Sequence, residues 1–97
     1  MTLRQLQYFQ QVCQWGGITA AAKKLHVSQP SITNSIKALE EEFNLLLFKR
    51  EKKKLTLTFE GELFYVEETH VLKDANDLTQ KMKDLSRSRN QIKLATS

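Results

Sequence analysis

Short hydrogen-bonding side chains are concentrated in one stretch of this 97-residue chain. The stretch carries Gln29, Ser31, Thr33, Asn34 and Lys37. Such groups can reach base edges in the major groove of DNA, and Gln and Asn are suited to paired hydrogen bonds with adenine. The pattern therefore predicts base recognition, provided that a helix presents these side chains on one face.

A second set of side chains is basic. Arg50 and the three lysines at 52–54 follow one another closely. The net charge of +4 lies entirely in residues 1–61, which hold nine Lys or Arg and five Asp or Glu, whereas residues 62–97 hold six of each. A local positive patch favours a polyanionic partner, although a charge run is also typical of a solvated surface.

Groups suited to catalysis or metal binding are sparse. The candidates are Cys13, His26 and His70, and none has neighbours at the spacing of a metal site or a catalytic triad. A single cysteine cannot form an internal disulfide, so we expect Cys13 to be a small core residue. The sequence predicts no enzyme activity, no catalytic residue, no metal and no cofactor.

The composition is that of an ordinary folded chain, with 40% hydrophobic and 27% charged residues. This length suffices for one domain, or for one domain with an appendage. No stretch approaches the roughly 20 apolar residues of a membrane-spanning helix, and the N-terminus lacks the basic and apolar segments of a secretory signal. We expect no membrane contact and a cytoplasmic location.

Two helices should precede the polar stretch. Apolar residues recur every three or four positions over residues 3–14, and Gly16 and Gly17 then end the first helix. We expect Thr19 to cap a second, short helix that ends near His26.

A third helix should carry the polar stretch. Ser28 can cap it, and Pro30 is tolerated in its first turn because the N–H that proline lacks would be unpaired there. Its apolar residues form one narrow stripe, which leaves the other face polar. The stripe consists of Ile32, Ile36, Leu39 and Phe43.

Beyond Asn44 the spacing of apolar residues changes to that of a small hairpin. It then returns to the spacing of a helix. Residues 47–50 and 55–58 are predicted to form two strands around a basic tip. A helix should then run from Phe59 to about residue 88, with Thr58 as its cap. Its length of roughly 45 Å is too great for a domain of this size to cover, so it should project.

This long helix carries apolar residues at heptad spacing, with Glu68 as an interruption. The heptads predict self-association, and the alternative is a helix packed on its own domain. The predicted dimerisation residues are Phe64, Val71, Ala75, Leu78, Met82 and Leu85. Residues 92–95 alternate like the start of a strand.

Two short helices joined by residues 26–28 are the pattern of a helix-turn-helix, to which the hairpin adds a wing. Ala22 supplies the small side chain that lets the two helices cross closely. The alternatives are a plain helical hairpin and an interaction adaptor that works through the long helix. Neither alternative explains the polar face of the third helix.

The residues also resemble a known family. The run AAAKKLHVSQPSITNSIKALEEEFNLLLFKR, followed by LTLTFEG, is similar to the N-terminal domain of LysR-type transcriptional regulators. The resemblance covers residues 1 to about 90. It implies a mainly α fold, a winged helix-turn-helix of three helices plus a two-stranded wing, followed by a long dimerisation helix.

The resemblance also implies sequence-specific binding of double-stranded DNA by a homodimer, at an interrupted inverted repeat, to control transcription. The base-contacting residues would be Gln29, Pro30, Thr33 and Asn34. The backbone-contacting residues would be Thr19, Ser28, Ser31, Lys37, Arg50, Lys52, Lys53 and Lys54.

This chain departs from the family pattern at several positions. Thr33 and Asn34 stand where the family commonly has Ser and Arg, which should alter base preference. Lysines replace the usual Gly-Arg at the wing tip, Asn44 replaces a Gly and Leu46 replaces a Pro. The last two changes should leave the fold intact.

The resemblance divides the chain into three parts. Residues 1–58 would be the DNA-binding domain, 59–90 the linker and dimerisation helix, and 91–97 the start of an effector-binding domain that is missing here. A small-molecule effector would bind only through that domain, and tetramers would need it. The regulator would be cytoplasmic and associated with the nucleoid.

Overall fold

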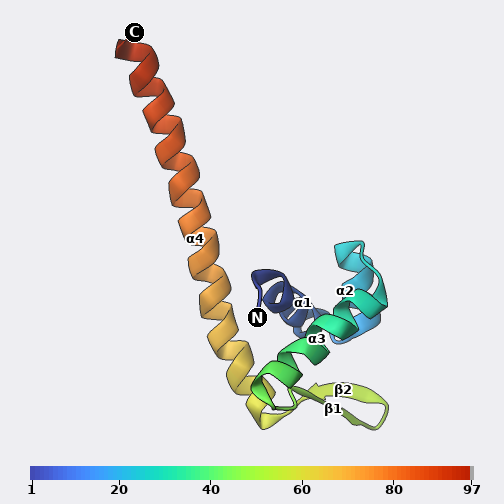
Figure 1. The fold of residues 1–97 in the computed structure, drawn as a ribbon. Coiled ribbons are helices and arrows are strands. Elements are labelled where there is room, and N and C mark those ends of the chain that lie inside the picture. The colour runs from blue at the N-terminus through green and yellow to red at the C-terminus, as the bar shows by residue number, and fades with distance from the viewer. Residues whose placement is uncertain (97) are drawn as a thin grey trace.

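Three helices, a two-stranded hairpin and one long helix follow one another along the chain (Figure 1). The computed structural model describes the backbone of residues 1–96 and the side chains of residues 1–89. The elements are α1 (Leu3–Trp15), α2 (Ile18–Leu25), α3 (Gln29–Phe43), β1 (Phe48–Glu51), β2 (Lys54–Leu57) and α4 (Phe59–Thr96). This architecture confirms the predicted winged helix-turn-helix and its long following helix.

Capping residues fix both ends of α1. The Gln5 backbone N–H donates to Thr2 Oγ1 at 3.1 Å, and the Thr2 N–H donates to Gln5 Oε1 at 3.0 Å, so the first turn is closed by a capping box. At the other end Gly16 adopts φ 76°, and its N–H donates to the Val12 carbonyl at 3.0 Å. Glycine ends the helix here because it takes this left-handed geometry without a Cβ clash.

Helix α2 begins two residues earlier than the sequence predicts. The N-cap is Gly17, which makes no side-chain capping bond, and Thr19 lies inside the first turn. The prediction of Thr19 as cap is therefore wrong. The reason is that Ile18 packs against the core, which draws its backbone into the helix. His26 then ends α2 in the left-handed region at φ 57°.

Two apolar clusters form the core. Val12, Ala21, Ala22, Ile32 and Ile36 are buried together where α1, α2 and α3 meet, and the small alanines allow the close crossing that the sequence predicts. A second cluster joins α1 and α3 to the start of the wing and to α4. Its fully buried members are Phe9, Leu39 and Leu47.

The start of α4 is clamped to the segment before β1. The Gly61 N–H donates to Thr58 Oγ1 at 2.9 Å, and that hydroxyl donates to the Leu46 carbonyl. A Cβ built on Gly61 would overlap the Leu47 carbonyl oxygen. Only glycine therefore allows α4 to approach the chain this closely.

Beyond its first turns α4 leaves the body and projects (Figure 1). Leu72 is the last of its buried apolar residues in the described part of the chain, and the molecule measures 65 × 25 × 19 Å. Residues 91–96 continue the helix, so the predicted strand at 92–95 is wrong as to secondary structure. A helix pairs its backbone groups internally, whereas a lone strand leaves them without partners. Among the described residues, no helix combines the length and apolar character needed to cross a bilayer.

Glu68 interrupts the heptad pattern because it faces the body of the domain. It is 2% exposed, Oε1 accepts from the Thr69 hydroxyl at 3.3 Å, and Oε2 has no hydrogen-bond partner. Burial raises the pKa of this carboxyl to about 7, although the Thr69 hydroxyl acts in the opposite direction. Burial and the charge of Glu68 also raise the pKa of the Cys13 thiol to about 12. Cys13 is therefore a protonated, packed thiol at neutral pH.

We predict that Gly61→Ala destabilises the fold. The added methyl group must displace the Leu47 backbone, which costs about 1–3 kcal/mol of unfolding free energy. Denaturant titration followed by circular dichroism measures this loss. Gly17→Ser is the matched control, because its Cβ meets no atom within 4 Å, and we expect a change below about 1 kcal/mol there. Equal stabilities of the two variants would contradict the close approach of α4.

We also predict that stability falls as the pH rises. The pKa of Glu68 is higher in the folded state, so its stabilising effect is fully present below its ordinary pKa of about 4.5 and is lost as the pH passes through about 7. The loss is on the order of 3 kcal/mol. Glu68→Gln should flatten this pH profile, whereas Glu67→Gln on the exposed face should not. Identical profiles for both variants would rule out Glu68 as the cause.

Candidate nucleic-acid interface

Helix α3 presents opposite faces to the core and to solvent. Ile32, Ile36 and Leu39 are buried, as the stripe predicts, although Phe43 stays 41% exposed. On the other face Thr33 is half-buried, and the other residues of α3 that are predicted to contact DNA are exposed. The exposed residues are Gln29, Pro30, Ser31, Asn34 and Lys37.

The start of α3 is organised as the sequence predicts. The Ser31 N–H donates to Ser28 Oγ at 3.2 Å, and the two hydroxyls lie 2.7 Å apart. Pro30 occupies the first turn. Ser28 and Ser31 thus bind each other while both remain exposed, so each keeps only part of its hydrogen-bonding capacity for another partner.

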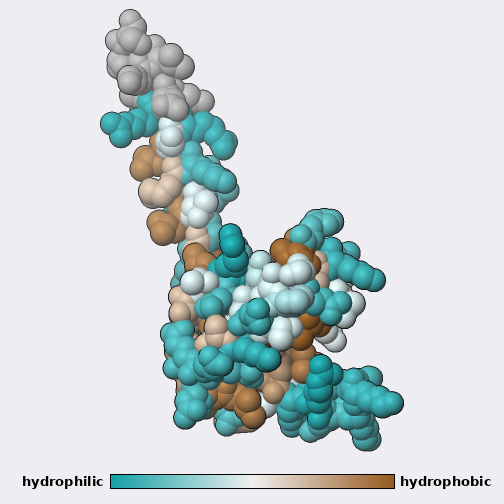
Figure 2. All heavy atoms as spheres, turned by 45° about the vertical axis from the view of Figure 1, so that its right-hand side comes forward, coloured by the Kyte–Doolittle hydropathy of each residue, from teal (hydrophilic) through white to brown (hydrophobic). Residues whose placement is uncertain are grey.

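The wing is a hairpin with a two-residue tip. Glu51 pairs with Lys54, which leaves Lys52 and Lys53 as the loop, both with positive φ of 48° and 66°. Such turns favour Asn or Gly, and a left-handed backbone costs roughly 1 kcal/mol for other residues. The lysines place positive charge at the outermost point of the wing, which Figure 2 shows as a hydrophilic projection.

A hollow of about 790 Å³ separates the start of α2 from the wing, and we call it the α2–wing hollow. Figure 1 shows α2 and the wing on the side of α3 that faces away from α4. Within the part of the chain that the structure describes, the charged residues lining this hollow are all basic. Its predicted contact residues are Thr19, Gln29, Thr33, Arg50, Lys53 and Lys54.

The other predicted contacts lie outside this lining. Lys37 lines a neighbouring hollow together with Thr33 and Arg50. Asn34 is exposed on α3, and Lys52 is exposed at the wing tip. The structure therefore brings α2, α3 and the wing together around one hollow, which Asn34, Lys37 and Lys52 do not line.

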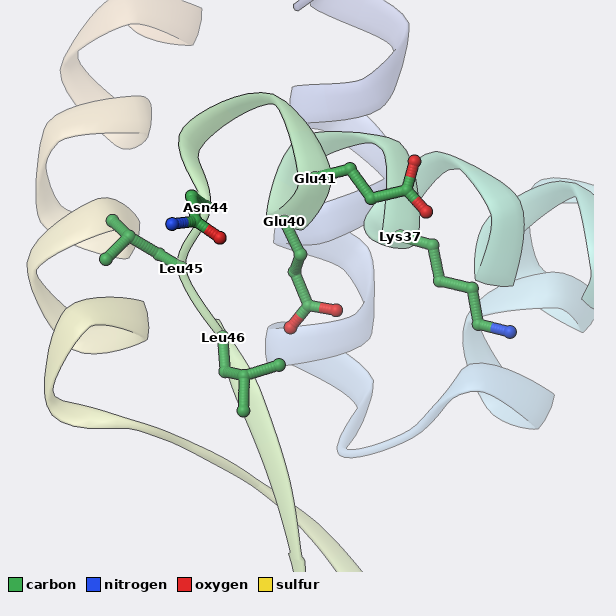
Figure 3. A pocket seen from close by; sticks show the side chains of 6 residues that line it. All are labelled: Lys37, Glu40, Glu41, Asn44, Leu45 and Leu46. Atoms are coloured by element: carbon green, nitrogen blue, oxygen red, sulfur yellow. The ribbon is translucent and has the colours of Figure 1, made fainter.

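Glu40 fixes the wing relative to α3. Figure 3 shows its carboxylate directed toward the chain that enters β1, between Lys37 and Leu46. Oε2 accepts from the Leu47 N–H at 2.7 Å and from the Phe48 N–H at 3.3 Å. The sequence does not indicate this role of Glu40, since nothing in its spacing shows that two backbone groups converge on it.

Trp15, Gly16 and Gly17 also line the α2–wing hollow. The sequence pattern indicates only that the first helix ends at these residues. A lone tryptophan beside two glycines at a helix end was the available signal, but its position beside the wing depends on the tertiary fold.

The predicted dimerisation residues fall into two groups. Val71, Leu78, Met82 and Leu85 are 43–60% exposed, and they follow the projecting part of α4, where Figure 2 shows apolar side chains at the surface. Ala75 is half-buried. Phe64 also has contacts within its own chain, because its ring lies 4.9 Å from that of Phe9 and 6.1 Å from that of Phe43.

The role of Phe64 in self-association stays a prediction, since its side chain is only half-buried in the single chain. Phe64 packs against the edge of the domain's own core, and Glu68 is buried. The heptad pattern covers both kinds of contact, because the same face of α4 turns from the body at its start to solvent further along.

Comparison with known proteins identifies the family. Residues 3–62 match the model of the bacterial regulatory helix-turn-helix protein, lysR family. The chain is 42% identical over 86 residues to the HTH-type transcriptional regulator BsdA of Bacillus subtilis (strain 168), covering 88% of this chain and 30% of that protein. It is 38% identical over 96 residues to CzcR of Bacillus thuringiensis subsp. konkukian (strain 97-27), another HTH-type transcriptional regulator, covering 99% of this chain and 33% of that protein.

Solved structures agree with the sequence relatives. A BenM_DBD/catB site 1 DNA complex matches with a TM-score of 0.84 and 32% identity, over 89% of this chain and 97% of that one. A CbnR_DBD–DNA complex matches with a TM-score of 0.81 and 36% identity, over 89% and 99% of the two chains.

The chain spans about a third of the length of the curated relatives it matches, and those relatives are named as transcriptional regulators. The matched residues include α1, α2, α3 and the wing. This chain therefore belongs to the LysR family of bacterial regulatory helix-turn-helix proteins and carries the family's helix-turn-helix DNA-binding domain.

Proposed function

We propose that this domain binds double-stranded DNA in a sequence-specific manner and thereby controls transcription. The observation that carries the proposal is the α2–wing hollow, which brings predicted contact residues from three elements together and whose charged lining is basic. A positive concave surface next to an exposed polar helix face suits a duplex with a phosphate on each nucleotide. The solved relatives that are named as DNA complexes support the same function.

The proposed contacts form two sets, one to bases and one to phosphates. Gln29, Pro30, Thr33 and Asn34 lie along the exposed face of α3 and would contact bases in the major groove. The second set would contact phosphates, which position the protein without selecting a sequence. It consists of Thr19, Ser28, Ser31, Lys37, Arg50, Lys52, Lys53 and Lys54.

The projecting part of α4 would join two copies of the chain. Val71, Leu78, Met82 and Leu85 leave an apolar stripe in solvent, with Ala75 beside it. Covering such a stripe with a second copy removes apolar surface from water. Two domains held in this way would contact two half-sites of an interrupted inverted repeat.

The remaining parts of the proposal concern the intact regulator. Residues 1–58 would form the DNA-binding domain and 59–90 the dimerisation helix, whose first turns pack on that domain. Residues 91–97 would lead into an effector-binding domain, through which tetramers could form. The curated relatives are about three times as long as this chain, which leaves room for such a domain. We place the regulator in the cytoplasm, on the nucleoid.

Selection from a random duplex library at near-physiological salt tests the proposal. Recovery of an inverted repeat that binds far more tightly than its scrambled version would establish a sequence-specific dimer. Equal and steeply salt-dependent binding of both would refute sequence specificity. A complete lack of binding would refute the function and favour an adaptor that works through α4.

We predict different outcomes for the two contact sets. Asn34→Ala should relax preference at one base position of each half-site, at a cost of about 1–3 kcal/mol against the preferred base. Replacing lysines 52–54 with Gln should weaken all sequences alike and reduce the slope of log affinity against log salt by up to about 3. Competition binding with single-base variants measures the first effect, and titration over a range of salt concentrations measures the second. An unchanged preference in Asn34→Ala would show that Asn34 does not contact bases.

We further predict that Leu78→Asp produces a monomer. A carboxylate in the apolar stripe would have to be buried without a partner, which opposes association. Sedimentation equilibrium measures the mass, and Asn76→Asp supplies a control with the same added charge on the neighbouring polar surface. A dimer that persists in Leu78→Asp would show that the seam lies elsewhere.

A further inference from the structure

Trp15 lies on the border of the α2–wing hollow and has no part in the contacts proposed so far. It is the single tryptophan of the chain, and 41% of its surface remains exposed. Gly16 and Gly17 follow it along the same border, so no bulky side chain separates the ring from the hollow. A large aromatic side chain left in water at this place is available for a partner.

Two contacts hold the indole ring in position. Its Nε1–H donates to Gln11 Oε1 at 2.8 Å, and the Lys24 ammonium lies 4.5 Å from the ring centroid. Gln11 belongs to α1 and Lys24 to α2, so both helices contribute to the arrangement. These contacts restrict the ring and the ammonium before any partner arrives, which lowers the entropic cost of binding.

The surroundings favour an anionic partner with apolar patches. Arg50, Lys53 and Lys54 supply the charge of the hollow, and Lys24 adds a further ammonium beside the ring. The sugar–phosphate backbone of DNA offers both features, because the deoxyribose presents C–H groups and the phosphate a negative charge. An indole ring can pack on the deoxyribose while a neighbouring lysine pairs with the phosphate.

We propose that Trp15 and Lys24 form a backbone clamp, in which the ring packs on a deoxyribose and the Lys24 ammonium pairs with an adjacent phosphate. The clamp rests on the proposed function and extends the contact surface from α3 and the wing to the turn between α1 and α2. Because every nucleotide carries the same sugar and phosphate, the clamp contributes to affinity and orientation and leaves base preference unchanged.

The single tryptophan makes a direct test possible with the full chain. Acrylamide quenching of Trp15 fluorescence is measured with and without a random-sequence duplex at low salt, and anisotropy of a fluorescein-labelled copy of that duplex reports binding independently. We expect DNA to lower the quenching constant by about twofold or more, because the exposed part of the ring becomes covered.

Variants separate the ring from general effects on stability. Trp15→Ala should weaken binding of the duplex by about fivefold to tenfold, whereas Trp15→Phe should retain most of the affinity. Leu46→Ala is the matched control, since it removes a 67% exposed apolar side chain outside the hollow, and it should bind as the wild type does. Lys24→Gln should weaken binding more than Lys23→Gln, which removes the same charge from the preceding residue.

Each outcome has a definite consequence. Normal anisotropy with an unchanged quenching constant would overturn the clamp and leave the proposed function intact. Equal effects of the two lysine variants would overturn the role of Lys24. A lack of anisotropy change would overturn the proposed function and the clamp with it. The quenching measurement needs only the wild-type chain, so the test stands even if Trp15→Ala fails to fold.

Discussion

The burial of Phe9 is the contact on which the rest of the structure depends. Its side chain is 0% exposed, and its ring lies 5.2 Å from that of Phe48 and 4.9 Å from that of Phe64. One residue of α1 thus touches the first strand of the wing and the start of α4. Leu39 and Leu47 complete the same cluster, so α3 is joined to it as well. The positions of the wing and of the projecting helix are both set by this one group of side chains.

Glu40 adds directional hydrogen bonds to the packing of the aromatic cluster. Apolar packing holds elements together without fixing direction, whereas a hydrogen bond to a backbone N–H has a preferred geometry. With Oε2 bound to Leu47 and Phe48, the chain must leave α3 along one path. The hollow between α2 and the wing exists because that path turns the hairpin toward the start of α2.

Local patterns in the sequence sufficed for most of the fold. The stripe formed by Ile32, Ile36 and Leu39 defines α3, and Ser28, Asn44 and Gly16 mark helix ends, because each of these signals acts within a few residues. The polar face of α3 followed from the same stripe, so the exposure of Gln29 and Asn34 could also be predicted.

Contacts between distant segments could not be predicted in this way. Phe64 has the spacing of a dimer seam, yet its ring also contacts Phe9. Heptad spacing does not distinguish a partner within the chain from one outside it. The close approach of Gly61 to Leu47 and the position of Trp15 beside the wing likewise depend on how the elements pack. Thr19 is a good capping residue, but Ile18 packs against the core and the helix begins before Thr19.

Because α4 is unbroken, the direction in which its apolar stripe faces around the helix axis is fixed relative to the start of the helix. It is clamped at Gly61 and passes without interruption to the apolar stripe around Leu78. Each residue added between these points would turn the stripe by about 100° around the helix axis and move it by about 1.5 Å. Insertions or deletions of about seven residues, close to two full turns, would leave the stripe facing nearly the same direction. The length of this segment therefore determines the direction in which the apolar stripe faces relative to α3 and the wing.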